Sequence, residues 1–319
     1  MNTTNPTFFQ IAQLTEDTAR EVLEGIMWPN GATCPHCQSI DVYKYTSASK
    51  NVRPGLYMCN TCRKQFTVTV GTIFEDSRIP LNKWLMAIYL MCASKKSVSA
   101  HQLHRELEIT YKSAWFMCHR IRYAMTQSPL NSMLESKLSG TVEADEVFIG
   151  GKEKNKHKSK RTEGTQGRST KTKTPVAVLV ERGEKGRSVA KKVKDTKGKT
   201  LKENIHENVD PSANMMTDEW TGYNGLDKEF ASHETVDHSK EEYVRGNVHT
   251  NTAESWIALL QRGIYGTYHH VSPQHLDRYA NEFAFRWDFR KTEDGERMVE
   301  AVKGAKGKRL QYKDPIQKQ

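Results

Sequence analysis

Four cysteines near the start of the chain form two Cys-x-x-Cys pairs that are 21 residues apart. Each pair can make a tight turn that directs two thiolates to one point, and four thiolates suit the tetrahedral preference of Zn²⁺. Short β-rich runs lie around the pairs, over residues 42–45, 56–58 and 65–70. The spacing therefore predicts a zinc ribbon that holds one structural zinc ion. Its ligands would be Cys34, Cys37, Cys59 and Cys62.

Disulfides and a redox-active pair are the alternatives for these cysteines. Disulfides are disfavoured because no segment has the apolar core of a secretory signal, and a redox pair usually occurs once, beside a βαβ unit. The other two cysteines, Cys92 and Cys118, stand singly among apolar residues and are expected to be buried thiols. No apolar run is long enough to span a membrane. We therefore expect a cytoplasmic protein.

The net charge of +10 and the pI near 9.2 favour a nucleic acid or another anionic surface as the partner. The length of 319 residues suggests two or three domains. We expect double-stranded DNA as the partner, with the protein nucleoid-associated when bound, as the resemblance described below implies.

Helical patterns surround the ribbon. Residues 15–27 predict an amphipathic helix that is capped by Thr15. A second group begins near residue 79, and its last two helices, starting at Ser99 and Tyr111, are separated by a short break. This arrangement predicts a helix-turn-helix-like region, although a helical bundle with a solvated basic face explains it about equally well. The side chains expected on DNA here are Tyr111, Lys112, Arg120 and Arg122.

Residues 139–290 have the alternating rhythm of an α/β domain. Strands are expected near 141–149, 175–180, 187–190, 213–218 and 234–236, and helices near 200–206, 253–260 and 275–285. A sheet that begins with antiparallel hairpins and continues with strands and helices in this order is what an RNase H-like fold requires. The predicted fold class is therefore α/β multidomain.

The expected domains follow from these patterns. Residues 152–173 contain nine lysines and arginines against two acids and few apolar side chains, which predicts a mobile basic arm. The end of the chain is basic as well and is expected to be a frayed, flexible tail. The boundaries are 1–75 for the N-terminal helix and ribbon, 76–138 for the helical region, 139–300 for the RNase H-like domain and 301–319 for the tail.

Three carboxylates occupy places that suit metal binding. Asp145 lies in the first strand of the α/β domain, Asp218 ends a later strand, and Glu254 lies in the first turn of a helix. Carboxylates on adjacent strand ends and a nearby helix can hold two Mg²⁺ ions for an in-line displacement. Each acid also has a simpler explanation, because Asp145 could face solvent, Asp218 could cap a helix, and Glu254 could complement a helix dipole.

Two further acids compete with Asp145. Strand alternation places Glu143 on the face of Asp145 and Glu146 on the opposite face, and this parity does not decide which acid is functional.

Several blocks of the sequence resemble bacterial insertion-sequence transposases that carry an N-terminal zinc ribbon and a DDE-type catalytic domain. The blocks are WPNG at 28–31, the two cysteine pairs with RKQF at 63–66, VEADE at 142–146 with GG at 150–151, TDE at 217–219 with Tyr223, HTNTAESW at 249–256 through RG at 262–263, GTYHHVSP at 266–273, and HL at 275–276. Together they cover most of residues 15–290.

The resemblance implies that Asp145, Asp218 and Glu254 are the first, second and third catalytic acids, which ligate two Mg²⁺ or Mn²⁺ ions. It implies a transposase that binds terminal inverted repeats, hydrolyses DNA strands and joins the 3′-hydroxyl ends to target DNA, as a homodimer or larger assembly. Family members often have a lysine seven residues past the third acid, where this chain has Gln261 followed by Arg262, the expected phosphate contact. The alternative is a DNA-binding regulator without catalytic activity.

Overall fold

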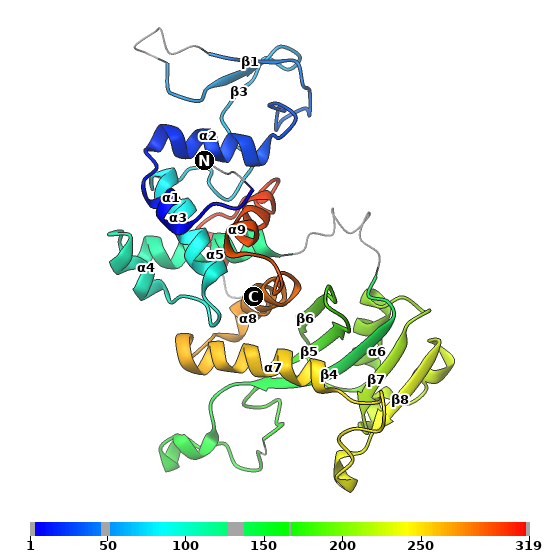
Figure 1. The fold of residues 1–319 in the computed structure, drawn as a ribbon. Helices are drawn as coiled ribbons and strands as arrows, with labels where there is room; N and C mark the ends of the chain where they lie inside the picture. The colour runs from blue at the N-terminus through cyan, green and yellow to red at the C-terminus, as the bar shows by residue number, and fades with distance from the viewer. Residues whose placement is uncertain (1–3, 46–51, 127–136, 166, 317–319) are drawn as a thin grey trace. The chain divides into compact units, whose positions relative to one another are not determined.

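The structure, a computed structural model, describes residues 4–45, 52–126, 137–165 and 167–316. The chain forms two compact units (Figure 1). The first contains the residues up to Thr126 together with those from Thr292 onward, and the second is the intervening segment up to Lys291. The described part contains no helix that is long and apolar enough to cross a bilayer.

The N-terminal ribbon is a three-stranded antiparallel sheet. Its strands are β1 (Val42–Lys44), β2 (Tyr57–Cys59) and β3 (Gln65–Phe66), in the order β1-β2-β3. Tyr57 and Phe66 stack with ring centroids 5.5 Å apart, and Trp28 packs edge-on against both rings. The aromatic side chains and three of the four cysteines form one small core, which confirms the predicted zinc-ribbon arrangement.

Helices make up the rest of the first unit. Thr15, Ser99 and Thr110 each accept a hydrogen bond from the backbone N–H three residues on, so the polar caps read from the sequence begin the helices as predicted. Residues 107–110 join the two short helices of the helix-turn-helix-like region. The helices are α1 (Phe8–Ala12), α2 (Glu16–Met27), α3 (Leu81–Ala93), α4 (Ala100–Glu106), α5 (Tyr111–Met125), α9 (Asp294–Lys303) and α10 (Lys313–Ile316).

The C-terminal residues depart from the expected frayed tail. Met298, Val302 and Ala305 are fully buried in the first unit. Lys308 Nζ donates to the carbonyl oxygen of Ala124 at 3.1 Å, and Arg309 forms an ion pair with Glu75 at 3.4 Å. Residues 301–316 therefore pack as part of the helical unit. The sequence did not predict this because the basic composition masks the apolar face of α9. The last three residues of the expected tail lie outside the described residues.

A five-stranded mixed sheet forms the centre of the second unit, with the strand order β6-β5-β4-β7-β8 (Figure 1). Strands β5 and β6 continue from β4 as antiparallel neighbours, whereas β7 pairs parallel to β4 and β8 pairs parallel to β7. This confirms the α/β sheet that begins with hairpins. The strands are β4 (Thr141–Ile149), β5 (Thr174–Glu181), β6 (Ser188–Lys192), β7 (Asn214–Asp218) and β8 (Ser232–Val236).

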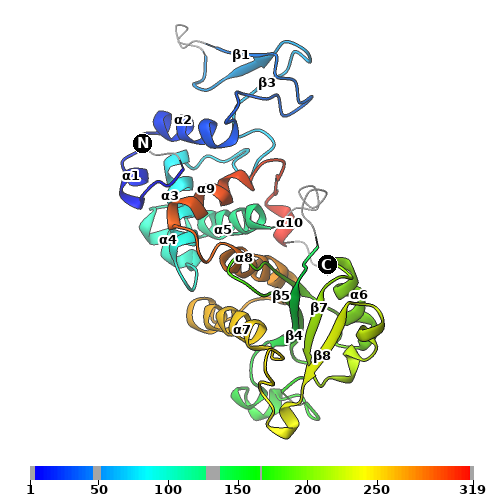
Figure 2. The same ribbon diagram turned by 45° about the vertical axis from the view of Figure 1, so that its right-hand side comes forward.

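Helices cover both faces of this sheet (Figure 2). On one face, α7 (Asn251–Gly263) and α8 (Leu276–Asp288) bury Trp256 and Phe283 against Val147 and its neighbours. On the other face, α6 (Gly198–Asn208) packs against Val142 and Ala144. Successive residues of β4 alternate between these two cores, so Glu143 and Asp145 lie on the α7 face and Glu146 on the α6 face.

The basic segment 152–173 has no core of its own. It contains two short 3₁₀ turns, Glu153–Asn155 and Lys158–Lys160, and its side chains are mostly exposed. Gln166 lies outside the described residues. The predicted mobility of this arm stays a prediction.

Candidate active site

The four cysteines of the ribbon converge on one point. Their sulfur atoms all lie within 4.8 Å of one another, with Cys34 Sγ 3.7 Å from Cys62 Sγ and Cys37 Sγ 3.6 Å from Cys59 Sγ. A tetrahedron with Zn–S bonds of about 2.3 Å has edges of about 3.8 Å, so the spacing fits zinc. All six cysteines of the chain lie among the described residues and are free thiols, which excludes disulfides in this structure.

The ribbon favours the thiolate form of one of the four cysteines. The backbone N–H of Cys62 donates to Cys59 Sγ at 3.5 Å and lowers the pKa of Cys59 to about 6, whereas burial and the neighbouring sulfur atoms raise the pKa of Cys37 to about 12 in the absence of a metal ion. A thiolate is the form of cysteine that ligates a metal.

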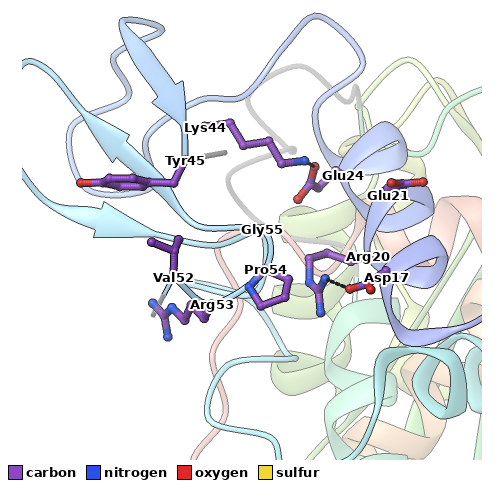
Figure 3. A pocket seen from close by; sticks show the side chains of 10 residues that line it. All are labelled: Asp17, Arg20, Glu21, Glu24, Lys44, Tyr45, Val52, Arg53, Pro54 and Gly55. Carbon is purple, nitrogen blue, oxygen red and sulfur yellow. Dashed lines mark hydrogen bonds and ion pairs between the residues drawn. The ribbon is translucent and has the colours of Figure 1, made fainter. Parts of the chain in front are cut away.

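A cavity of about 480 Å³ lies between α2 and the ribbon (Figure 3). Lys44 of β1 reaches toward α2 and pairs with Glu24 at 2.7 Å, and the hydroxyl of Tyr57 donates to the same carboxylate. The cavity is lined by as many acidic as basic side chains, so it has no net charge that would attract a phosphate backbone. The charged lining residues are Asp17, Glu21, Glu24, Arg20, Lys44 and Arg53.

In the helix-turn-helix-like region, two of the four side chains that were expected to contact DNA are buried. Tyr111 and Lys112 are exposed at the start of α5, but Arg120 and Arg122 are only 5% and 2% exposed. Arg120 donates to the backbone carbonyl of Glu75, and burial lowers its pKa to about 10. The Arg120 guanidinium group also lies over the rings of Trp84 and Phe116, so this buried side chain, like that of Arg122, belongs to the interior rather than to a contact face.

Asp145 and Asp218 lie on neighbouring parallel strands. The β4–β7 ladder ends at the pair Glu143–Met216, and its offset continued by two residues would bring Asp145 opposite Asp218. Burial, with smaller contributions from the negative charges of Asp218 and Glu254, raises the pKa of Asp145 to about 7. Burial also raises the pKa of Asp218.

Glu254 lies in the first turn of α7 and keeps half of its side chain exposed. Its Oε1 atom accepts a hydrogen bond from the Thr250 hydroxyl at 3.3 Å, and His238 Nε2 lies 3.9 Å away. Because its charge raises the pKa of Asp145, Glu254 lies within electrostatic range of that carboxyl group. Among the described residues, the cysteines are the one group of three or more candidate ligands gathered within 4.8 Å, so the three acids are spread more widely. Ligands of two ions about 3.5–4 Å apart can be spread in this way.

The structure gives the competing acids other partners. Glu143 is fully buried, and its carboxylate accepts hydrogen bonds from Arg182 and from two backbone N–H groups of α7. Glu146 accepts a hydrogen bond from the Tyr223 hydroxyl on the opposite face of the sheet. Glu146 nevertheless lies within electrostatic range of Asp145 and Asp218, because burial and, to a smaller extent, these two charges raise its pKa to about 7.

Two cations accompany the acids, and sequence reasoning placed neither of them beside these side chains. Arg168 of the basic arm counteracts the raised pKa values of Asp145 and Asp218 by its positive charge. Arg182 follows β5 directly and binds Glu143, and nothing in its local sequence distinguishes it from other surface arginines. Arg262, the expected phosphate contact, is exposed in the last turn of α7, with Gln261 partly buried beside it.

Comparisons with known proteins match both units. A family model described as an ISXO2-like transposase domain matches residues 137–288, and one described as a transposase zinc-ribbon domain matches residues 14–65. An uncharacterized protein in transposable element ISH50 of Halobacterium salinarum is 32% identical, over 87% of this chain and 93% of its own length. No solved structure gives a significant match.

Proposed function

We propose that this chain, which belongs to the family of ISXO2-like transposases, cuts DNA strands at the terminal inverted repeats of its element and joins the resulting 3′-hydroxyl ends to target DNA. The family membership agrees with the resemblance in the sequence blocks. The cutting and joining chemistry, its residues and its metal ions are our proposal.

The observation that carries the proposal is the placement of three carboxylates on neighbouring elements, with Asp145 in β4, Asp218 at the end of β7 and Glu254 in the first turn of α7. Burial, with smaller contributions from Asp218 and Glu254, raises the pKa of Asp145 to about 7, so a cation among the three would favour its ionised form. The donor set consists of oxygen atoms alone, which suits Mg²⁺ or Mn²⁺. When bound, two such ions would activate the attacking oxygen and stabilise the leaving oxygen of the phosphodiester.

The chain's own residues then have separate tasks. Asp145, Asp218 and Glu254 would hold the ions between the sheet and α7. Arg262 and the basic arm at 152–173 would neutralise substrate phosphates, and Arg168 is the arm residue whose charge already reaches the acids. This work would take place in the cytoplasm, on the nucleoid.

Recognition of the repeat DNA would belong to the first unit. The ribbon, held by one zinc ion, and the exposed start of α5 with Tyr111 and Lys112 would contact the duplex. Two DNA ends must be processed, which favours a homodimer or larger assembly on DNA.

The test is cleavage of DNA from the ends of the element in the presence of Mg²⁺ or Mn²⁺. Asp145→Asn, Asp218→Asn and Glu254→Gln should each bind the repeat DNA and fail to nick or join it, whereas Gln261→Ala should retain the chemistry. Normal cleavage by Asp145→Asn would move the assignment to Glu146. A wild-type protein that binds the repeats but cuts with neither ion would instead be the regulator.

A further inference from the structure

Strand β4 carries three acids within four residues, and the proposed function uses only the middle one. Glu143, Asp145 and Glu146 are all shielded from solvent to some degree, and Glu143 is completely buried. Burying a carboxylate is costly unless it is paired and hydrogen-bonded, so the contacts of the two flanking acids indicate what they do.

Glu143 supplies the missing cap of α7. The residue before this helix, Thr250, makes no side-chain cap hydrogen bond. Instead, the Glu143 carboxylate accepts hydrogen bonds from the N–H groups of Thr252 and Ala253 at 2.7 and 2.8 Å, and from the Thr252 hydroxyl at 2.7 Å. A negative charge on the free N–H groups of a helix start is favourable. The contacts end at the residue immediately before Glu254.

Arg182 extends this anchor to the segment that leads into α7. Its Nε donates to Glu143 at 2.5 Å, and its other nitrogens donate to the carbonyl oxygens of Asn247 and His249, both at 2.7 Å. Arg182 thus holds the segment before α7, and Glu143 holds the first turn of α7. Because Glu143 belongs to β4, this strand fixes the position of Glu254.

Glu146 makes the corresponding contact on the other face of the sheet. The β4–β7 ladder ends at the pair Glu143–Met216, so Asp145 and Asp218 lie beyond its last paired residues. Past that point, the Tyr223 hydroxyl donates to Glu146. Tyr223 lies in the turn Thr221–Tyr223, shortly after Asp218, and its ring is buried in the α6 core.

We propose that Glu143 and Glu146 are positioning residues that fix the other two acids of the site relative to Asp145. Glu143 holds the start of α7, which carries Glu254, and Glu146 holds the turn after Asp218 through Tyr223. This inference rests on the proposed function, because it assumes that the three acids share metal ions. Directional hydrogen bonds from one strand would then set the ligand geometry on both faces of the sheet.

The test measures Mn²⁺ binding to the DNA-free protein by electron paramagnetic resonance, beside Mn²⁺-dependent cleavage and the thermal midpoint. Tyr223→Phe and Thr252→Val each remove one hydroxyl and keep the size of the side chain. Each should weaken Mn²⁺ binding by up to about tenfold, the lower end of the loss seen when a direct hydrogen-bond partner of a metal ligand is removed, because each hydroxyl here acts through a positioning residue. The matched control is Tyr265→Phe, because Tyr265 is 52% exposed; it should bind Mn²⁺ like the wild type.

Glu146→Gln separates positioning from direct ligation. Its amide oxygen can still accept from Tyr223, so a positioning residue leaves Mn²⁺ binding close to that of the wild type. If Glu146→Gln loses Mn²⁺ as fully as Asp145→Asn, Glu146 is a ligand and the proposal is overturned. Unchanged Mn²⁺ affinity in Tyr223→Phe and Thr252→Val, even with a lowered thermal midpoint, overturns it too, because those hydroxyls would then serve stability alone. A wild type that binds no Mn²⁺ refutes the proposed function itself.

Discussion

Replacing Gly263 with alanine tests the packing of α7 on α8. A Cβ atom at Gly263 would lie 2.0 Å from Cζ of Phe283 and 2.8 Å from its Cε1, whereas ordinary contact begins at 3.4 Å. The ring would therefore have to retreat by about 1.4 Å. Phe283 is fully buried in the core that also contains Trp256 and Leu260, so it has no free space to enter.

Two effects of opposite sign decide the outcome. Alanine is favoured over glycine in a helix interior by about 1 kcal/mol. Overpacking a core costs typically about 1–3 kcal/mol, and a clash against a fully buried ring belongs at the upper end. We therefore expect Gly263→Ala to lower the free energy of unfolding of the second unit by about 1–2 kcal/mol.

Urea unfolding of the full chain, followed by circular dichroism and tryptophan fluorescence, measures this loss. Gly266→Ala is the control in the same unit and Gly25→Ala the control within α2, because a Cβ at either position meets nothing within 4 Å. Gly25→Ala should gain about 0.5–1 kcal/mol from helix propensity alone. Adding Phe283→Leu should recover part of the loss in Gly263→Ala. If Gly263→Ala is as stable as the wild type, the described contact between α7 and α8 is wrong.

Three further predictions follow from the sites. Purified protein should contain about one zinc per chain, and Cys59→Ser should lose it together with the folded ribbon, as elemental analysis would show; full zinc content in that variant would contradict the four-cysteine centre. Lys112→Ala should reduce the slope of log binding constant against log salt concentration by about one unit, because one phosphate contact is lost. Arg120→Met should lower folding stability and leave this slope unchanged. A changed slope in Arg120→Met would mean that Arg120 contacts DNA after all. Because the folded-state pKa of Asp145 is raised from 3.8 to about 7, the folded protein binds more protons than the unfolded chain between these values, so its free energy of unfolding without added Mg²⁺ or Mn²⁺ should fall as the pH rises through that window. Asp145→Asn should reduce this slope and leave the part due to Glu146, whose pKa is also raised to about 7, and an equal slope in both proteins would refute the assigned burial.

Local patterns were sufficient to predict much of the fold. The cysteine spacing predicts the ribbon because both turns are short, and Thr15, Ser99 and Thr110 mark helix starts because a cap acts within three residues. The order of strands and helices likewise predicts the mixed sheet. These features depend on neighbours in sequence or on the simple alternation of a strand.

Other features depend on partners that are far away in the sequence. Arg120 is held by the carbonyl oxygen of Glu75, 45 positions earlier in the sequence, and by the ring of Trp84 in α3. Strand parity separates Glu143 from Glu146 but does not reveal that Thr252 and Tyr223 are their partners. The sequence thus limits the candidate metal ligands to a few acids. Which of these acids bind other side chains or backbone groups is visible only in the three-dimensional contacts.

Because the chain returns to the first unit after Thr292, the order of synthesis affects when that unit can finish folding. The described residues from Thr292 onward complete the same unit as those up to Thr126, and Met298 and Val302 fill its interior. A ribosome therefore synthesises the entire intervening unit before the helical unit can acquire its last helices. The newly emerging chain can complete the sheet of the second unit while the helical unit still lacks α9. Under the proposed function, repeat DNA would be engaged only once synthesis is almost finished, and truncated products would carry the proposed catalytic acids without a complete helical unit.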